Sequence, residues 1–344
     1  LTNDGVLPLD ESTDIGIIGA FADHPRYQGA GSSQVVPTRL DDVRRHAEER
    51  FTGRVGYAIG YDPDTGRSDA TRLREAIDLA RSVDVPIVFV GLPAVEEAEG
   101  CDRDTLTLPP AHDELVTAVC AANPRTVVVL VSGAPVLLPW AERPAALVEA
   151  YLGGQAAGGA IVDVLVGDAE PGGRLAETFP ASMVFPSEEH FAGRTRQVQY
   201  REGLYVGYRF HDTAEVAPRF PFGHGGSYTT FDWSEARLSG DGVDLSIELT
   251  ITNSGHRPGS EVVQLYVRDV ESTVYRPDKE LRAFAKVHLE PGESETVTLA
   301  LDERAFAFYD IDADRWRVEP GSFELLVGDS SVDRRDTLVV EVAG

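Results

Sequence analysis

The sequence of 344 residues has few lysines and lacks long apolar runs. Its two lysines are Lys279 and Lys286, and 57 acidic residues against 31 basic ones give a net charge of −26. Nucleic acids are bound through basic patches, so this composition argues against a nucleic-acid partner. No run approaches the ~20 apolar residues of a membrane-spanning helix, so we expect no membrane partner.

Cysteine is also scarce. Cys101 and Cys120 are too few for a disulfide framework, and the cysteines and eight histidines show no metal-ligand spacing. We therefore expect neither a metal nor a cofactor. The sequence starts at Leu1 without a basic segment followed by an apolar one, so the compartment stays open, with the cytoplasm slightly favoured over secretion.

The acidic residues are spread through well-patterned segments, which indicates a folded protein with an acidic surface rather than a disordered tail. Self-repulsion at such a charge destabilises the compact state at low salt. In molar salt the Debye length falls to ~3 Å and most of that repulsion disappears. The excess of acid over lysine therefore predicts a halophilic protein that works in a high-salt environment.

The first half alternates strands and helices. Near-continuous Val, Ile and Leu runs indicate strands that are buried on both faces of a sheet, and strand–helix–strand order indicates parallel strands. We expect an α/β three-layer sandwich with a mostly parallel sheet over residues 1–184. Thr38 and Asp69 are the expected N-caps of its first two helices. The expected strands are 14–20, 54–61, 86–92, 126–133 and 146–152, and the expected helices are 38–51, 69–83, 110–123 and 155–168.

The pattern changes after about residue 225, where apolar and polar residues alternate and turn sequences such as "NSG" and "EPGES" recur. Short alternating strands at this spacing predict an all-β sandwich over residues 229–344. The stretch 180–203 lacks helical or strand periodicity, and the linker we predict covers 185–228. We interpret it as a wrapping linker that ends the first domain.

An acidic loop, "VEEAEGCDRDTL" at residues 95–106, follows the apolar run "VPIVFVGL". Carboxylates at the end of a buried strand can be catalytic, or they can belong to a solvated loop. A second loop, "GAGSS" at 29–33, follows the first strand but lacks the Gly-Lys-Ser/Thr ending and any basic residue. It therefore does not predict a phosphate site.

Seven motifs follow one another along the chain: "LTNDGVLPL", "RYQGAGSSQVVPTR", "EEAEGCDRDTLTLP", "NPRTVVVLVSGAPVLLPW", "GGQAAGGAIVDVLVGDAEPGGRLAETFP", "YREGLYVGYRFHD" and "FPFGHGGSYTTF". In this order they resemble the C-terminal part of glycoside hydrolase family 3, and the resemblance covers nearly the whole chain. The last segment, 229–344, resembles the fibronectin type III-like domain of the family.

The resemblance implies roles for single residues. The acidic loop would supply the acid/base carboxyl of a retaining glycosidase, with Glu97 ranked ahead of Glu99 on the recurrent Glu-x-Glu-Gly pattern. The nucleophilic aspartate would lie in an N-terminal (β/α)₈ barrel that this sequence does not contain. The remaining implied residues are Gly31, Ser32 and Ser33, which would line the sugar site, and Asp102 and Arg103, which would support the acidic loop.

The implied function is the C-terminal portion of a retaining enzyme that hydrolyses β-linked glucosides or xylosides. This chain alone would then be inactive, because only one carboxyl of the catalytic pair is present. The barrel could belong to the same chain or to a separate one. Two other interpretations stay open: a non-catalytic carbohydrate-binding or structural module, and a flavodoxin-like binding domain fused to a sandwich. The sequence leaves the oligomeric state open, with a homodimer as one candidate.

Overall fold

The computed structural model describes residues 1–100, 103–184 and 200–343, and its chain forms two compact units. The first unit comprises Leu1–Pro171 and Ala181–Met183. The second comprises Gly172–Pro180 and the chain from Val184 onward. Residues 185–199 of the predicted linker lie outside the described residues. No helix in the described ranges is long and apolar enough to cross a membrane.

The first unit is built on one six-stranded sheet with the order β1-β6-β5-β4-β2-β3. All neighbouring strands are parallel except β1, which runs antiparallel to β6. Its elements are β1 (Thr2–Asn3), β2 (Ile15–Ile18), η1 (Ala20–Ala22), α1 (Val43–Arg50), β3 (Val55–Ala58), α2 (Ala70–Arg81), β4 (Val85–Gly91), η2 (Ala94–Glu96), α3 (Pro110–Ala122), β5 (Val127–Val131), β6 (Ala146–Glu149) and α4 (Ala157–Val166).

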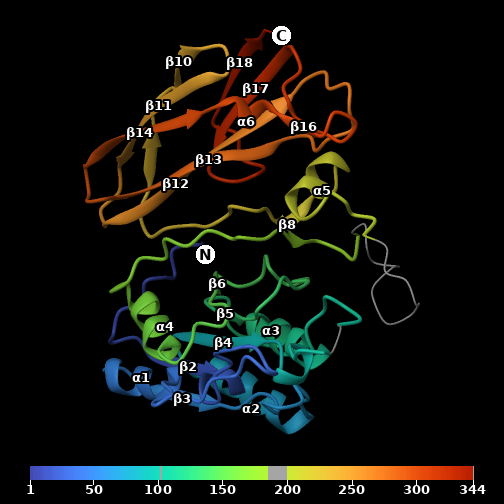
Figure 1. The fold of residues 1–344 in the computed structure, drawn as a ribbon. Coiled ribbons are helices and arrows are strands. Elements are labelled where there is room, and N and C mark those ends of the chain that lie inside the picture. Colours follow the sequence, from blue (N-terminus) through green and yellow to red (C-terminus); the bar gives the residue numbers. More distant parts are fainter. Residues whose placement is uncertain (101–102, 185–199, 344) are drawn as a thin grey trace. The chain divides into compact units, whose positions relative to one another are not determined.

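Every residue of β4 and β5 is buried, as their uninterrupted apolar sequences predict. The helices form two pairs, since α1 packs with α4 and α2 with α3, and together they cover the sheet (Figure 1). The predicted three-layer α/β arrangement is therefore confirmed. Asp69 is the N-cap of α2, as expected, and accepts hydrogen bonds from the backbone N–H groups of Thr71 and Arg72.

The predicted start of the first helix is wrong. Helix α1 begins at Val43, and its N-cap is Asp42 rather than Thr38. The Asp42 carboxylate accepts a hydrogen bond of 2.8 Å from the backbone N–H of Arg45, which satisfies a donor that a helix start leaves unpaired. The preceding residue, Asp41, donates its backbone N–H to the Gln155 carbonyl and so keeps the chain out of the helix.

The second unit contains two antiparallel four-stranded sheets. One has the order β10-β11-β14 with β9 also on β11, and the other has the order β13-β12-β17-β18. Its elements are β7 (Phe179–Pro180), α5 (Tyr208–Thr213), β8 (Pro218–Phe220), β9 (Phe231–Trp233), β10 (Arg237–Asp241), β11 (Asp244–Asn253), β12 (Gly259–Asp269), β13 (Glu280–Leu289), β14 (Ser294–Leu301), α6 (Glu303–Phe306), β15 (Phe308–Asp310), β16 (Arg315–Arg317), β17 (Gly321–Gly328) and β18 (Asp336–Val342).

A single apolar core joins the two sheets. It includes Ile247 and Ile251 from β11, Leu265 from β12 and Leu325 from β17, all fully buried. Alternate residues of β11 and β14 face this core, which is the period-2 pattern expected of strands with one buried face. The predicted all-β sandwich is therefore confirmed.

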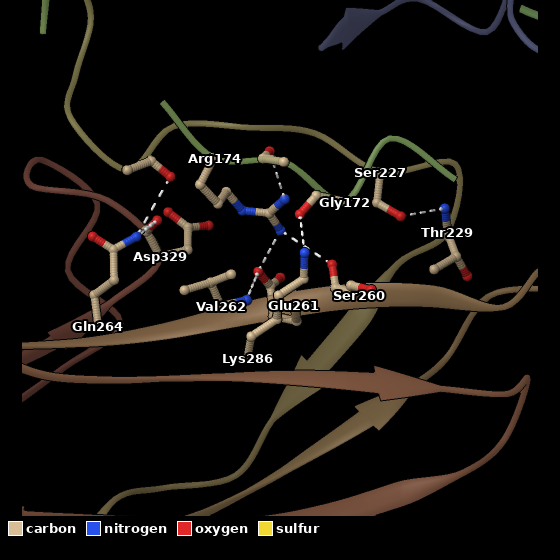
Figure 2. A network of polar contacts seen from close by, with 12 residues as sticks. Gly172, Arg174, Ser227, Thr229, Ser260, Glu261, Val262, Gln264, Lys286 and Asp329 are labelled. Atoms are coloured by element: carbon tan, nitrogen blue, oxygen red, sulfur yellow. Dashed lines mark hydrogen bonds and ion pairs between the residues drawn. The ribbon is translucent and has the colours of Figure 1, made fainter. Parts of the chain in front are cut away.

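The short segment Gly172–Pro180 belongs to the second unit and is held there by polar contacts. The Arg174 guanidinium donates to the Glu261 carboxylate across 2.7 Å, and both side chains are at least nine-tenths buried. Lys286 donates to the Gly172 carbonyl at 2.7 Å. Figure 2 shows Arg174 reaching down to β12, with Lys286 beside it.

Candidate active site on the acidic loop

The acidic loop lies at the carboxyl end of β4, with η2 forming its first turn. It runs beside the loop that follows η1. The backbone N–H of Ala30 donates to the Glu97 carbonyl at 3.1 Å, and the N–H of Glu99 donates to the Ala30 carbonyl at 3.1 Å. The structure therefore brings the predicted acid/base glutamates next to the predicted sugar-lining loop. The carboxyl ends of strands in open parallel sheets are where such folds commonly bind ligands.

The Glu97 side chain is enclosed, and both of its carboxylate oxygens accept hydrogen bonds. Its Oε2 accepts a hydrogen bond of 3.0 Å from Nη2 of Arg26, and its Oε1 accepts one of 2.5 Å from the backbone N–H of Gly133. The Glu97 side chain is only 8% exposed. Arg26 also donates to the carbonyls of Leu92 and Gln28. These contacts tie the acidic loop to the end of β5 and to the segment after η1.

Glu99 is exposed, and its contacts differ. Its Oε2 accepts hydrogen bonds from the backbone N–H of Ser32, at 2.8 Å, and from the Ser32 hydroxyl. These two donors lower the pKa of the Glu99 carboxyl below its usual value. Gly31 has a φ of 109°, and an added Cβ would lie 2.5 Å from Cβ of Glu99. Only glycine at position 31 allows this close approach. The third predicted sugar-lining residue, Ser33, is exposed.

The third glutamate of the loop, Glu96, is half-buried, and burial raises the pKa of its carboxyl while the nearby Arg103 opposes the rise. Arg103 and Glu96 line a cavity of about 270 Å³ whose other walls include Val95 and Leu108. Asp102, the predicted partner of Arg103, lies outside the described residues, as does Cys101. The proposed pair of loop-supporting residues thus remains a prediction.

Sequence reasoning missed Glu149, at the carboxyl end of β6. The residue is half-buried, but its Oε2 is enclosed and has no hydrogen-bond partner among the described residues. Its Oε1 accepts a hydrogen bond of 2.8 Å from the backbone N–H of Tyr151. Burial raises the pKa of Glu149 to about 8, and the nearby negative charge of Glu97 adds to the rise. The only signal in the sequence was an acidic residue at the end of an apolar strand.

Within the described ranges, no group of three or more His, Cys, Asp or Glu side chains is arranged to hold a metal ion.

Comparison with protein families identifies the domains of this chain. The model of the glycosyl hydrolase family 3 C-terminal domain matches residues 1–228. The chain belongs to this family. The model of the fibronectin type III-like domain matches residues 261–331, within the β-sandwich, as the motif order predicted.

Curated family 3 relatives include the thermostable β-glucosidase B of Acetivibrio thermocellus, which is 46% identical over 337 residues, covering 96% of this chain and 45% of the relative. They also include an exo-α-(1→6)-L-arabinopyranosidase of Bifidobacterium breve, 38% identical over 99% of this chain and 47% of the relative. The chain thus spans about half the length of these relatives.

Solved family 3 structures agree with the fold. A β-glucosidase of Bifidobacterium adolescentis superposes with a TM-score of 0.94 at 39% identity, over 99% of this chain and 51% of that chain. A β-glucosidase of Kluyveromyces marxianus in complex with glucose gives a TM-score of 0.94 at 26% identity, over all of this chain and 60% of that one. Both units of this chain therefore have counterparts in glycosidases of known structure.

Proposed function

We propose that this chain is the C-terminal part of a retaining β-glycosidase and that it supplies the acid/base carboxyl from the acidic loop. The nucleophilic carboxyl would come from the half of the relatives' length that this chain does not cover. The observation that carries the proposal is Glu99, an exposed carboxylate held by Ser32 at the carboxyl edge of the parallel sheet.

The choice of Glu99 reverses the order that the sequence pattern favoured. An acid/base carboxyl must reach the glycosidic oxygen and later a water molecule, so it needs an exposed oxygen. Glu97 has both oxygens occupied, by Arg26 and by Gly133, which suits a bracing role. Glu99 keeps Oε1 free of the Ser32 contacts and is open to solvent. Glu97 remains the competing candidate that the experiments below must eliminate.

The proposed mechanism follows the geometry of retaining glycosidases, in which the two carboxyls lie about 5–5.5 Å apart. Protonated Glu99 donates its proton to the glycosidic oxygen while the nucleophile attacks the anomeric carbon and the C–O bond breaks. The Glu99 carboxylate then removes a proton from the water that hydrolyses the glycosyl intermediate. Ser32 lowers the pKa of Glu99, and a second carboxylate at this distance would raise it, so the two influences oppose each other.

The substrates we propose are β-linked glucosides, with β-xylosides as the second sugar class. The support is the β-glucosidase relative that is 46% identical over nearly the whole chain. The relatives also include an arabinopyranosidase, so family membership alone leaves the preferred sugar open. Much of the sugar pocket would belong to the half of the protein outside this chain.

The proposal is tested with two proteins. One is this chain alone, and the other is a hybrid enzyme that joins the chain to the part of the Acetivibrio thermocellus relative that the match leaves uncovered. At molar salt, we expect the hybrid enzyme to release nitrophenol from nitrophenyl β-glucoside and the chain alone to release none. Turnover by the chain alone above that of a Glu97→Gln, Glu99→Gln double variant would contradict the proposal. So would a folded hybrid enzyme that hydrolyses no glycoside.

A further inference from the structure

A cavity of about 600 Å³ lies in the β-sandwich unit, away from the acidic loop in the sequence. Its lining comes from both sheets: Phe231 and Trp233 of β9 and Leu249 of β11 belong to one sheet, and Val327 of β17 belongs to the other. Asp336, the first residue of β18, also lines it. A volume of this size falls in the range of roughly 300–1,000 Å³ typical of small-molecule sites.

The lining of this cavity combines apolar residues with polar and charged ones, and one of its hydrogen-bond donors has no acceptor in the described part of the chain. Leu249 and Val327 are nearly fully buried and belong to the core of the sandwich. Trp233 packs against the same core, but its indole Nε1 is enclosed and has no acceptor among the described residues. A buried N–H without an acceptor costs free energy, because it has lost its bond to water. A ligand that offers an oxygen at this point would recover that energy.

Hydrogen bonds and ion pairs hold the charged residues that line the cavity beside Trp233. Arg335 donates to Asp329 at 2.9 Å and to Asp333 at 3.0 Å, and its guanidinium carbon lies 5.1 Å from the centre of the Trp233 ring. Asp336 accepts a hydrogen bond of 2.9 Å from the backbone N–H of Ala236. These contacts hold the cavity walls in place without a ligand, as expected of a preformed site.

The charges at the rim decide which ligand fits. Asp232 and Glu235 line the cavity and are exposed, so their carboxylates can accept hydrogen bonds from hydroxyl groups. They repel anions, and the charge of Arg335 is already balanced by two carboxylates. A simple cation offers no acceptor for the indole N–H of Trp233. A fitting ligand is therefore neutral, carries hydroxyl groups and an acceptor oxygen, and has an apolar face that can pack on Phe231 or Trp233.

A pyranose ring has these properties, since its C–H face is apolar and its edge carries hydroxyl groups. We propose that the cavity lined by Trp233, Asp232, Glu235 and Arg335 is a non-catalytic binding site for a neutral saccharide. Such a site raises the local concentration of a sugar chain around the protein that holds it. The inference does not depend on the acid/base carboxyl or on the missing half of the catalytic site.

The test uses this chain as it is, titrated with cellobiose and xylobiose by isothermal calorimetry at molar salt. We expect saturable binding that Trp233→Phe weakens about 3- to 10-fold, because one hydrogen bond worth ~0.5–1.5 kcal/mol is lost while the ring is kept. The matched control is Trp316→Phe, an exposed tryptophan of the same unit that lies outside the cavity and stacks with Arg304. It should leave the affinity unchanged.

A second variant covers the case in which Trp233→Phe does not fold. Asp232→Ala combined with Glu235→Ala changes only exposed side chains and should also weaken binding at least 3-fold. No binding of either disaccharide would overturn the inference. So would equal affinity in the folded cavity variants, or a loss of binding in Glu99→Gln alone, which would place the sugar on the acidic loop.

Discussion

Arg26 and Glu97 form an ion pair of 3.0 Å in which both side chains are largely enclosed, at 11% and 8% exposure. The pair joins two loops at the carboxyl edge of the sheet, and Gly133 contributes a backbone N–H to the same carboxylate. Glu99, two residues further along, is exposed and contacts Ser32 instead. This difference in surroundings is the basis of our proposal that Glu97 braces the loop and that Glu99 is the acid/base.

Replacing Arg26 with methionine should destabilise the first unit by about 3–5 kcal/mol, because the substitution leaves Glu97 buried and unpaired. Urea unfolding followed by circular dichroism measures the change. The matched control is Arg45→Met, which removes the same head group from an exposed pair with Glu49 on α1. Such pairs contribute only about 0.3–0.5 kcal/mol. Equal effects of the two substitutions would contradict the bracing role.

The Arg174–Glu261 pair in Figure 2 should hold the segment Gly172–Pro180 to the sandwich. We expect Arg174→Met and Glu261→Leu each to cost about 3–5 kcal/mol, because each leaves the other charge buried without its partner. The double variant should cost less than the sum of the two, since it removes both charges. A double-mutant cycle from urea unfolding tests this, and strictly additive costs would show that the pair is not coupled.

Glu149 should make stability depend on pH. Burial raises the folded-state pKa of its carboxyl to about 8, above the unfolded value near 4.3. Between these two values the unfolded chain has lost the proton and the folded chain keeps it, so this residue lowers stability as pH rises through the window. Below about 4.3 and above about 8 its contribution is constant. Glu149→Gln should remove this dependence.

The measurement is urea unfolding at pH 5 and pH 8 for the wild type and the Glu149→Gln variant. The variant should gain stability relative to the wild type at pH 8 by up to about 1.4 kcal/mol per pH unit of the window. Glu114→Gln, an exposed substitution on α3, is the control. If the wild type and Glu149→Gln keep the same difference at both pH values, the buried carboxyl does not titrate in this range.

Salt should stabilise the whole chain, because a net charge of −26 is repulsive and molar salt screens it. We expect the melting temperature to rise between millimolar and molar potassium chloride. For units of this size each kcal/mol gained corresponds to about 2–4 °C. Sucrose is the control, because it favours compact states without screening charge. A melting temperature that is the same in low and high salt would rule out the halophilic interpretation.

The fold could be predicted from the sequence because its signals are local. Continuous apolar runs such as 86–92 indicated strands buried on both faces, and the alternation in 244–253 indicated a strand with one buried face. The start of α1 could not be found in this way. Thr38 and Asp42 are both good N-caps by residue type, and the choice depends on the hydrogen bond between Asp41 and Gln155, which are far apart in the sequence.

The site was predicted only in part. Motif order located the acidic loop and Ser32, and the structure brings both loops together. Motif order could not separate Glu97 from Glu99, because the surroundings of Glu97 are set by Arg26 and Gly133, which are 71 and 36 residues away in the sequence. Glu149 was missed for the same reason, since its burial depends on tertiary neighbours rather than on its own segment.

The most direct test of the acid/base assignment compares Glu99→Gln and Glu97→Gln in the hybrid enzyme, using β-glucosides with good and poor leaving groups. A good leaving group needs little protonation, so we expect Glu99→Gln to slow cellobiose hydrolysis about 10²- to 10⁴-fold and to slow dinitrophenyl β-glucoside much less. Added azide should restore turnover of the activated substrate and give a β-glucosyl azide, because an anionic nucleophile needs no general base. Glu97→Gln should show neither effect. Leaving-group dependence and azide rescue in Glu97→Gln, or in neither variant, would contradict the assignment.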